Sequence, residues 1–287
     1  MHRSVLQAVC WFREADMMKK IKHYMSVAVL SFRLSFQTCM EYPAAFIGWL
    51  ISNPIQFLVG FSTIKFVVEE FETLADWNFK ELAFLYGMSV LTHGLSVIFF
   101  TKTWFMGWEI VHGELDRMRL RPMNTLFQYL AADLNFYGIT DLIPGIILFV
   151  YGCISVDFQW TFTNTICMIC AIIGGTLLRG AIYLAFGSTT FWTKSPLHVS
   201  GFFQELFNRT NMYPLSMYPR GVQFVFTFIM PMSWVAFYPA SEFMGKDSML
   251  TLPYGMAFIT LGLGAVLFVI ACKIFNAGFA QYESAGS

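Results

Sequence analysis

Residues 162–186 of the chain read FTNTICMICAIIGGTLLRGAIYLAF, in which Arg179 is the one charged side chain. A helix needs about 20 predominantly apolar residues to cross the hydrocarbon core of a bilayer, so this stretch is long enough to span it. Apolar runs such as residues 143–150 are continuous and do not alternate with polar residues, which argues against strands of a membrane barrel. The stretch therefore predicts a transmembrane helix.

Five further stretches have the same character. Together with the first they give six expected spans, at residues 44–68, 82–106, 129–154, 162–186, 222–238 and 254–274. The whole chain of 287 residues is 56% hydrophobic and 13% charged, whereas an ordinary soluble domain is about 25% charged. This composition excludes a disordered chain, a basic nucleic-acid-binding protein and a disulfide scaffold. It predicts an all-α, polytopic membrane protein with six transmembrane helices.

The distribution of Lys and Arg predicts the orientation of the chain. Thirteen of the 18 lie on the side that carries both termini, and two, Lys80 and Lys246, lie on the other side. Positive residues favour the cytoplasmic side, so both termini should be cytoplasmic in a multi-pass protein of the cell membrane. Three regions follow from this. They are a cytoplasmic arm at 1–43, a six-helix transmembrane domain at 44–274 and a cytoplasmic tail at 275–287.

The arm contains a stretch, residues 26–40, in which apolar and polar side chains are mixed. We expect it to be an interfacial helix that lies along the cytoplasmic face and connects to the first span. The alternative is a simple extension of the first span.

The chain lacks the usual motifs of a nucleotide or metal site. Its one Gly-Lys pair, Gly245-Lys246, precedes Asp247 and does not belong to a phosphate-binding loop. The five His are dispersed, and the six Cys are scattered through apolar stretches. Cys167 and Cys170 have metal-site spacing but no second pair, so we interpret them as small residues in a helix interface. We expect no catalytic residue, no metal and no cofactor in this chain.

Ionisable side chains at membrane depth are expensive unless they are paired or hydrated. Lys102, Asp133, Asp141 and Arg179 lie in expected spans. Two interpretations stay open, namely structural ion pairs between neighbouring helices and side chains that face a substrate path. A proton relay is a third. The leading expected pair joins Arg179 to Asp141, with Asp133 as the second possible partner.

The loop after the second span, from Trp108 to Pro122, reads WEIVHGELDRMRLRP. Gly113 can break the preceding helix, and Glu114 and Asp116 suit the first turn of a new one. A short amphipathic helix with its Arg side chains in the cytoplasm would offer a docking surface to a soluble partner. The alternative is that Arg117, Arg119 and Arg121 only reflect the preference of positive residues for the cytoplasm.

Several pieces of the chain, taken in order, resemble permease subunits of type-2 ATP-binding-cassette exporters, in a bacterial branch linked to drug or antimicrobial export. These pieces are Gly113-Glu-Leu-Asp-Arg117, Leu120-Arg-Pro122, Tyr218-Pro-Arg220, Phe237-Tyr-Pro-Ala240 and the tail Tyr282-Glu-Ser-Ala-Gly-Ser287. The pattern departs at Glu41-Tyr42-Pro43, where a basic residue is expected after the Tyr.

The resemblance implies a division of labour between subunits. Two permeases, identical or related, form the path, and two separate ATPase subunits bind ATP and magnesium beneath them. The segment at about 108–125 would be the coupling helix that inserts into an ATPase groove. Its implied residues are Gly113, Glu114, Asp116, Arg117, Arg121 and Pro122. Residues 239–252 would form the outer element that caps the path.

The sequence thus favours a transport subunit in contact with membrane lipid, without its own ATPase site and without nucleic acid as a partner. Two other classes stay open. One is a membrane-embedded enzyme that modifies lipids, which would need clustered acid, base or metal-binding groups. The other is an ion-coupled carrier that would use Asp141 or Arg179 as its coupling residue.

Overall fold

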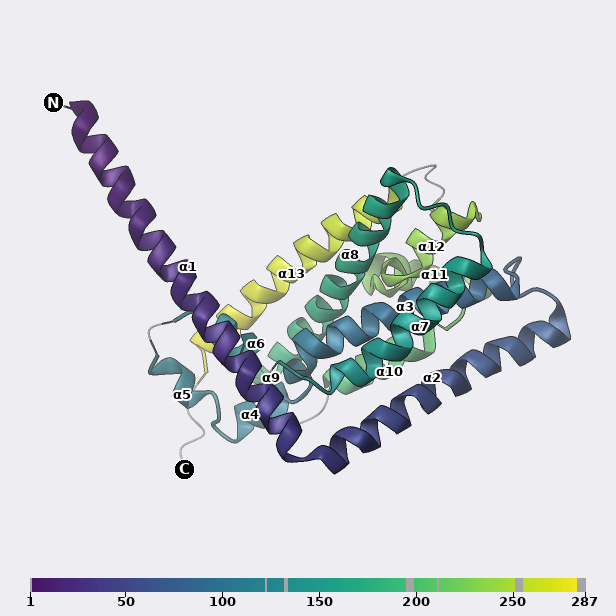
Figure 1. Cartoon of the computed structure of the whole chain (residues 1–287), viewed down its shortest axis with the longest axis horizontal. Helices are drawn as coiled ribbons and strands as arrows, with labels where there is room; N and C mark the ends of the chain where they lie inside the picture. Colours follow the sequence, from purple (N-terminus) through teal and green to yellow (C-terminus); the bar gives the residue numbers. More distant parts are fainter. Residues whose placement is uncertain are drawn as a thin grey trace.

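The structure of the protein is a computed structural model that describes residues 2–121, 123–131, 134–194, 199–210, 212–250 and 255–282. Every regular element in these ranges is helical (Figure 1), which confirms the expected all-α class. Pro122, Asp133 and the tail after Tyr282 lie outside the described residues.

Five of the expected spans are continuous apolar helices. They are α2 (Pro43–Phe71), α3 (Phe79–Phe100), α7 (Gly138–Ser155), α8 (Phe162–Ser188) and α13 (Met256–Ala280). The apolar path of α3 continues through η1 (Thr101–Trp104) and α4 (Met106–Val111). Capping explains where two of these helices begin. Asn78 and Glu81 form a reciprocal capping box at α3, and the Thr161 hydroxyl accepts from the Asn164 N–H at α8.

Glycines let the central helices approach closely. A Cβ atom at Gly152 of α7 would lie 2.6 Å from the Cα of Phe84 in α3. A Cβ atom at Gly174 of α8 would lie 2.6 Å from the backbone N of Leu261 in α13. Small residues have this role in membrane bundles, because van der Waals packing must hold helices together where lipid is as apolar as the side chains. Gly152 and Gly174 therefore set the α3–α7 and α8–α13 contacts.

The N-terminal arm is one helix, α1 (His2–Glu41), which turns at Tyr42 into α2. Figure 1 shows the two helices meeting at a sharp angle, so α1 is not a collinear extension of the first span. Pro43 occupies the first turn of α2, where its missing N–H costs nothing. The arm contacts the body through aromatic rings, with Phe32 4.5 Å from Phe136 and Tyr24 4.7 Å from Phe127.

The expected third span, 129–154, is two helices. The first is α6 (Thr125–Ala131), and α7 starts only at Gly138. The described residues between them form a turn in which the Asn135 side chain accepts from the Tyr137 N–H. The apolar run of α7 is 18 residues, which is at the short end for a span.

The fifth expected span, 222–238, is not a continuous helix. It is divided into α11 (Arg220–Phe224), the π-helical η3 (Val225–Ile229), η4 (Met232–Val235) and α12 (Phe237–Met244). The break falls at Met230–Pro231, because proline has no N–H to continue the helix. Figure 1 shows α11 nearly end-on while α8 and α13 are seen from the side, so α11 runs across those helices.

The segment between the expected fourth and fifth spans, residues 187–221, was expected to be a loop, but part of it packs against the helix bundle. It contains the one-turn α9 (Thr190–Thr193), α10 (Val199–Thr210) and η2 (Leu215–Met217). Phe203 of α10 stacks on Phe186 of α8 with 3.8 Å between ring centroids. Phe207, which is fully buried, contacts Tyr183 one turn deeper along α8. The apolar face of α10 therefore packs against α8.

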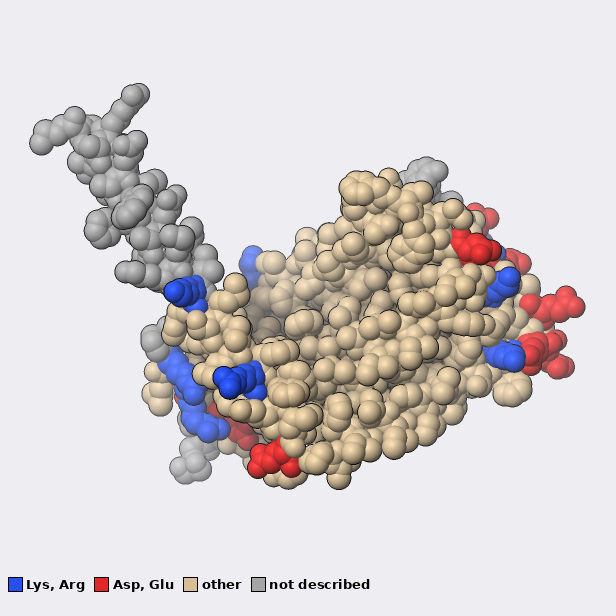
Figure 2. Space-filling model, viewed as in Figure 1, with Lys and Arg blue, Asp and Glu red and all other residues tan. Residues whose placement is uncertain are grey.

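Charged side chains gather at the two ends of the molecule. Figure 2 shows an uncharged middle band, with most visible Lys and Arg at the end that carries α5 (Asp116–Arg119). Most visible Asp and Glu lie at the opposite end, where α2 meets α3. An uncharged band between two charged ends is what a bilayer requires.

Candidate functional site

The segment after α4 leaves the membrane-spanning body and folds back on it. Gly113 has a φ of +74°, in the left-handed region that glycine adopts without a Cβ penalty, and ends the helical path. The turn is closed by hydrogen bonds from the Glu114 N–H to the Glu109 carbonyl and from the Asp116 N–H to the Gly113 carbonyl. The new helix α5 then has Asp116 in its first turn. The helix therefore breaks at Gly113 as expected, but the new helix is a single turn that begins at Asp116, so Glu114 precedes it and does not lie in its first turn.

This short helix has an inner and an outer face. Leu115 is fully buried, and Met118 packs against the same apolar cluster. Arg117 and Arg121 are exposed, and Leu120 is 85% exposed. Glu114 is half-buried. The outer face of this turn therefore offers exposed apolar area and positive charge together.

Lys102 is paired with a residue that the sequence analysis did not single out. Its Nζ lies 3.1 Å from a carboxylate oxygen of Glu109, and both side chains are largely buried. The ammonium group also lies 5.5 Å from the centre of the Tyr129 ring. Glu109 follows Lys102 by seven residues, but the 3₁₀ turn η1 ends at Trp104 and α4 begins at Met106, so the spacing of a single helix did not predict the pair. The pair connects η1 to α4, shortly before the turn at residues 113–121.

Arg119 is also exposed, but its guanidinium reaches the end of α13. One of its terminal nitrogens donates to the Tyr282 carbonyl at 2.5 Å and to the Phe279 carbonyl at 3.4 Å. Its guanidinium lies 5.3 Å from the centre of the Phe279 ring and 5.3 Å from the centre of the Tyr282 ring. Sequence reasoning treated Arg119 as one of three equivalent cytoplasmic arginines, because its partner is 163 positions away.

Arg179 is 1% exposed, and its surroundings differ from expectation. It donates to the Ser89 hydroxyl at 3.0 Å and to the Ser89 carbonyl at 3.3 Å, and it lies 4.8 Å from the centre of the Phe207 ring. The expected ion pair with Asp141 is absent between these two described residues. Both α7 and α8 pack against α3, which meets α7 at Gly94 and Arg179 of α8 at Ser89, so α3 lies between the two expected partners. Asp141 instead lies where α7 passes Gly94 of α3.

A family model described as ABC-2 family transporter protein matches residues 54–286, which include every one of these features. The chain belongs to the ABC-2 transporter family. It is therefore the membrane component of an ATP-binding-cassette transporter and a multi-pass membrane protein. Among curated proteins and solved structures, the searches found no match.

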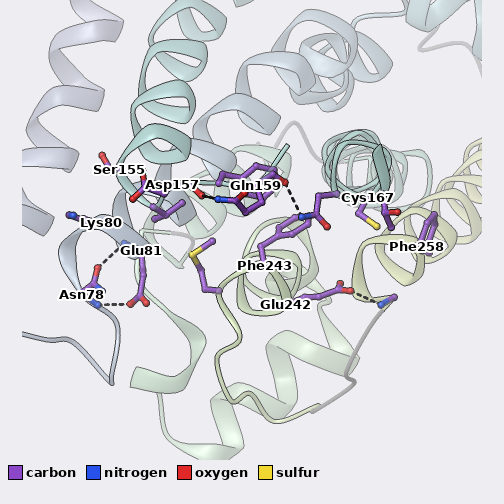
Figure 3. Close-up of a pocket in the computed structure, with 16 residues that line it drawn as sticks. Asn78, Lys80, Glu81, Ser155, Asp157, Gln159, Cys167, Glu242, Phe243 and Phe258 are labelled. Carbon is purple, nitrogen blue, oxygen red and sulfur yellow. Dashed lines mark hydrogen bonds between the residues drawn. The ribbon is translucent and has the colours of Figure 1, made fainter. Parts of the chain in front are cut away.

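This ABC-2 chain has a cavity of about 810 Å³ at the end opposite α5 (Figure 3). Most of its polar groups hold helix ends together. Glu242 of α12 accepts from the N–H groups of Gly255 and Ala257 and so caps α13, and Glu81 pairs with Lys246 at 2.9 Å. The cavity lies within the size range of small-molecule sites, with Phe243 as part of its apolar wall.

A second hollow of the ABC-2 chain, of about 720 Å³, is almost wholly apolar and lies toward the α5 end. Its walls come from α1, α3, α6, α8 and the residues beside α6. The lining residues are Ala28, Leu95, Phe99, Phe100, Asn124, Leu126, Phe127, Leu130, Ala131, Leu134, Ile173, Thr176 and Leu177. A groove of this composition on a membrane-spanning body suits hydrocarbon chains.

The described part of the ABC-2 chain has no group of three or more His, Cys, Asp or Glu that could hold a metal ion. Cys167 and Cys170 are free thiols in α8, and Cys167 packs with Ala171 and Ala257 at the contact with α13.

Proposed function

We propose that this chain is the permease subunit of an ATP-driven exporter, and that the segment at 108–125 docks a separate ATPase subunit. We call residues 113–121 the docking turn. The observation that carries the proposal is its outer face, where Arg117, Leu120 and Arg121 are exposed, while Leu115 on the other side is buried in the body of the protein. Arginine is enriched among the side chains that dominate binding energy, and burial of the apolar Leu120 side chain on association would add to it.

The proposed complex contains two ATPase subunits, which bind ATP and magnesium, and two permeases, either identical or related. Closure of the ATPases would push on the docking segment and shift the paired bundles between inward- and outward-facing states. The outer cavity and the segment 239–252 would form the exit end of the path, and drugs or antimicrobial compounds are the proposed cargo. Both termini would be cytoplasmic, and the interrupted segment 220–244 would complete a bundle of six spans.

The test is affinity purification of the tagged chain from its native membrane. We expect an ATPase subunit to be retained, and we expect retention to fall when Leu120 is replaced by Asp. An isolated chain that transports substrate without an ATPase would favour an ion-coupled carrier and would contradict the proposal.

A further inference from the structure

The C-terminal end of α13 is enclosed by other cytoplasmic elements. A Cβ atom at Gly278 would lie 2.5 Å from the Phe191 ring of α9, so the two helices are in direct contact. The Trp192 indole N–H donates to the Gln281 side chain at 2.9 Å. Tyr282 is 5% exposed and packs edge-on against Phe191. The C-terminal end of α13 is therefore held by packing and by a side-chain hydrogen bond to α9.

Arg119 of the docking turn also binds the end of α13. The Phe279 carbonyl lies in the last turn of α13, at the negative end of the helix dipole, and also accepts from the Tyr282 N–H, while the Tyr282 carbonyl lies two residues beyond the helix. A guanidinium suits both the carbonyls and the two ring faces, because it is planar, always charged and donates through a fork. A lysine at this position would keep the charge but lose the fork and the stacking.

The Asp116 carboxylate, at the other end of α5, lies close enough to the Tyr282 hydroxyl to act on it electrostatically. Burial and the nearby Asp116 carboxylate raise the pKa of Tyr282 to about 12, so the hydroxyl stays protonated near neutral pH. The single turn of α5 is thus tied to Tyr282 through Asp116 and through Arg119.

The α13 helix joins the docking turn to the outer face. Its 25 residues span about 37 Å. It packs along α8 at Gly174 and Gly264, and Glu242 of α12 caps its outer end. Packed, rigid elements of this kind can carry coupling between distant sites.

We propose that Arg119 is a positioning residue that locks α13 to the docking turn, so that movement of the turn reaches α12 at the outer face through α13. The proposal rests on the proposed docking of an ATPase. It assigns the two faces of α5 different tasks, with Leu120 and Arg117 facing the partner and Arg119 facing α13.

The experiment places a fluorescent label on a cysteine at Met249, an exposed position beyond α12, in a chain without its native cysteines. The complex with its ATPase is measured with ATP and vanadate and without nucleotide. We expect a label response in the native complex. Arg119→Ala should reduce that response by about fivefold or more while the ATPase stays bound. Arg119→Lys should give an intermediate response.

The matched control is Lys273→Ala, which removes an exposed cation from the same end of α13 and should leave the response unchanged. A full label response in the Arg119→Ala complex would overturn the proposal. If no ATPase binds the native chain, the proposed function fails instead, and the lock is then tested on the isolated chain. Amide exchange at residues 115–120 should rise by about fivefold or more in Arg119→Ala, and unchanged exchange would overturn the lock.

Discussion

Leu120 and Leu115 are five residues apart and have opposite environments, because the first is 85% exposed and the second is fully buried. Burying a leucine side chain at an interface contributes about 1.5–3 kcal/mol, or roughly 10- to 100-fold in affinity. We therefore expect Leu120→Asp to lower the amount of ATPase retained in a pull-down by about tenfold or more. Folding should be unaffected, since the side chain contacts solvent.

Leu120→Met is the matched control, because it keeps an apolar side chain of similar volume and should retain the ATPase. Full retention of the ATPase by Leu120→Asp would contradict docking through this face and would leave the preference of positive residues for the cytoplasm as the explanation for Arg117 and Arg121.

Arg179 offers a test of which partner holds a buried charge. Residues in direct contact show coupling energies of about 0.5–3 kcal/mol, whereas independent sites add within about 0.5 kcal/mol. In a double-mutant cycle followed by unfolding in detergent, Arg179→Ala and Ser89→Ala should be coupled by about 1 kcal/mol or more. Arg179→Ala and Asp141→Asn should be additive. Coupling to Asp141 in place of Ser89 would contradict the arrangement of α3, α7 and α8.

At the scale of residues, the sequence identified which charged side chains are energetically unfavourable at membrane depth, but it did not identify all of their partners. Arg179 and Lys102 stand out because a charge in an apolar run is visible in one dimension. Ser89 and Glu109 do not stand out, since a hydroxyl and a carboxylate near a span end are ordinary. The partner of Arg119 was hidden for a different reason, because backbone carbonyls have no identity in a sequence.

At the scale of elements, Gly152 is a sensitive position in the contact between α3 and α7. An added methyl group there would lie 2.6 Å from the Cα of Phe84, which is backbone and cannot move aside. Overpacking of this kind costs about 1–3 kcal/mol. We therefore expect Gly152→Ala to lower the free energy of unfolding in detergent by that amount.

Gly262→Ala is the control for this prediction, because the added methyl group would meet nothing within 4 Å on α13. Alanine favours a helix over glycine by up to about 1 kcal/mol, so this variant should be neutral or slightly more stable. Equal destabilisation by both substitutions would rule out close packing as the reason for Gly152.

Hydropathy predicted α2, α3, α8 and α13 to within about six residues, since these helices must satisfy their backbone internally, but it placed the start of the third span nine residues before α7. Hydropathy failed where an apolar stretch of the chain does not form one continuous helix. One span was expected over 222–238, yet Pro231 separates a π-helical turn from a 3₁₀ turn there. The α10 helix was expected in a cytoplasmic loop because of its charges, but Phe203 and Phe207 bury its other face.

At the scale of the whole molecule, the two ends differ in charge and in structure. The docking turn, the base of α1 and the end of α13 share one end, and the α2–α3 connection with Asp76 lies at the other (Figure 1). A membrane protein with this polarity has one orientation that satisfies the excess of Lys and Arg on the cytoplasmic side. Asp76 should therefore be external, and residues 2 and 286 should be cytoplasmic.

Cysteine labelling in intact cells measures this orientation directly. In a chain without its native cysteines, Asp76→Cys should react with a membrane-impermeant maleimide before the cells are opened, because Asp76 is exposed on the α2–α3 connection. Gly286→Cys and His2→Cys should react only after permeabilisation. Labelling of Gly286→Cys in intact cells, with Asp76→Cys protected, would show the opposite orientation. Arg117, Leu120 and Arg121 would then lie outside the cell, where no ATPase can reach them.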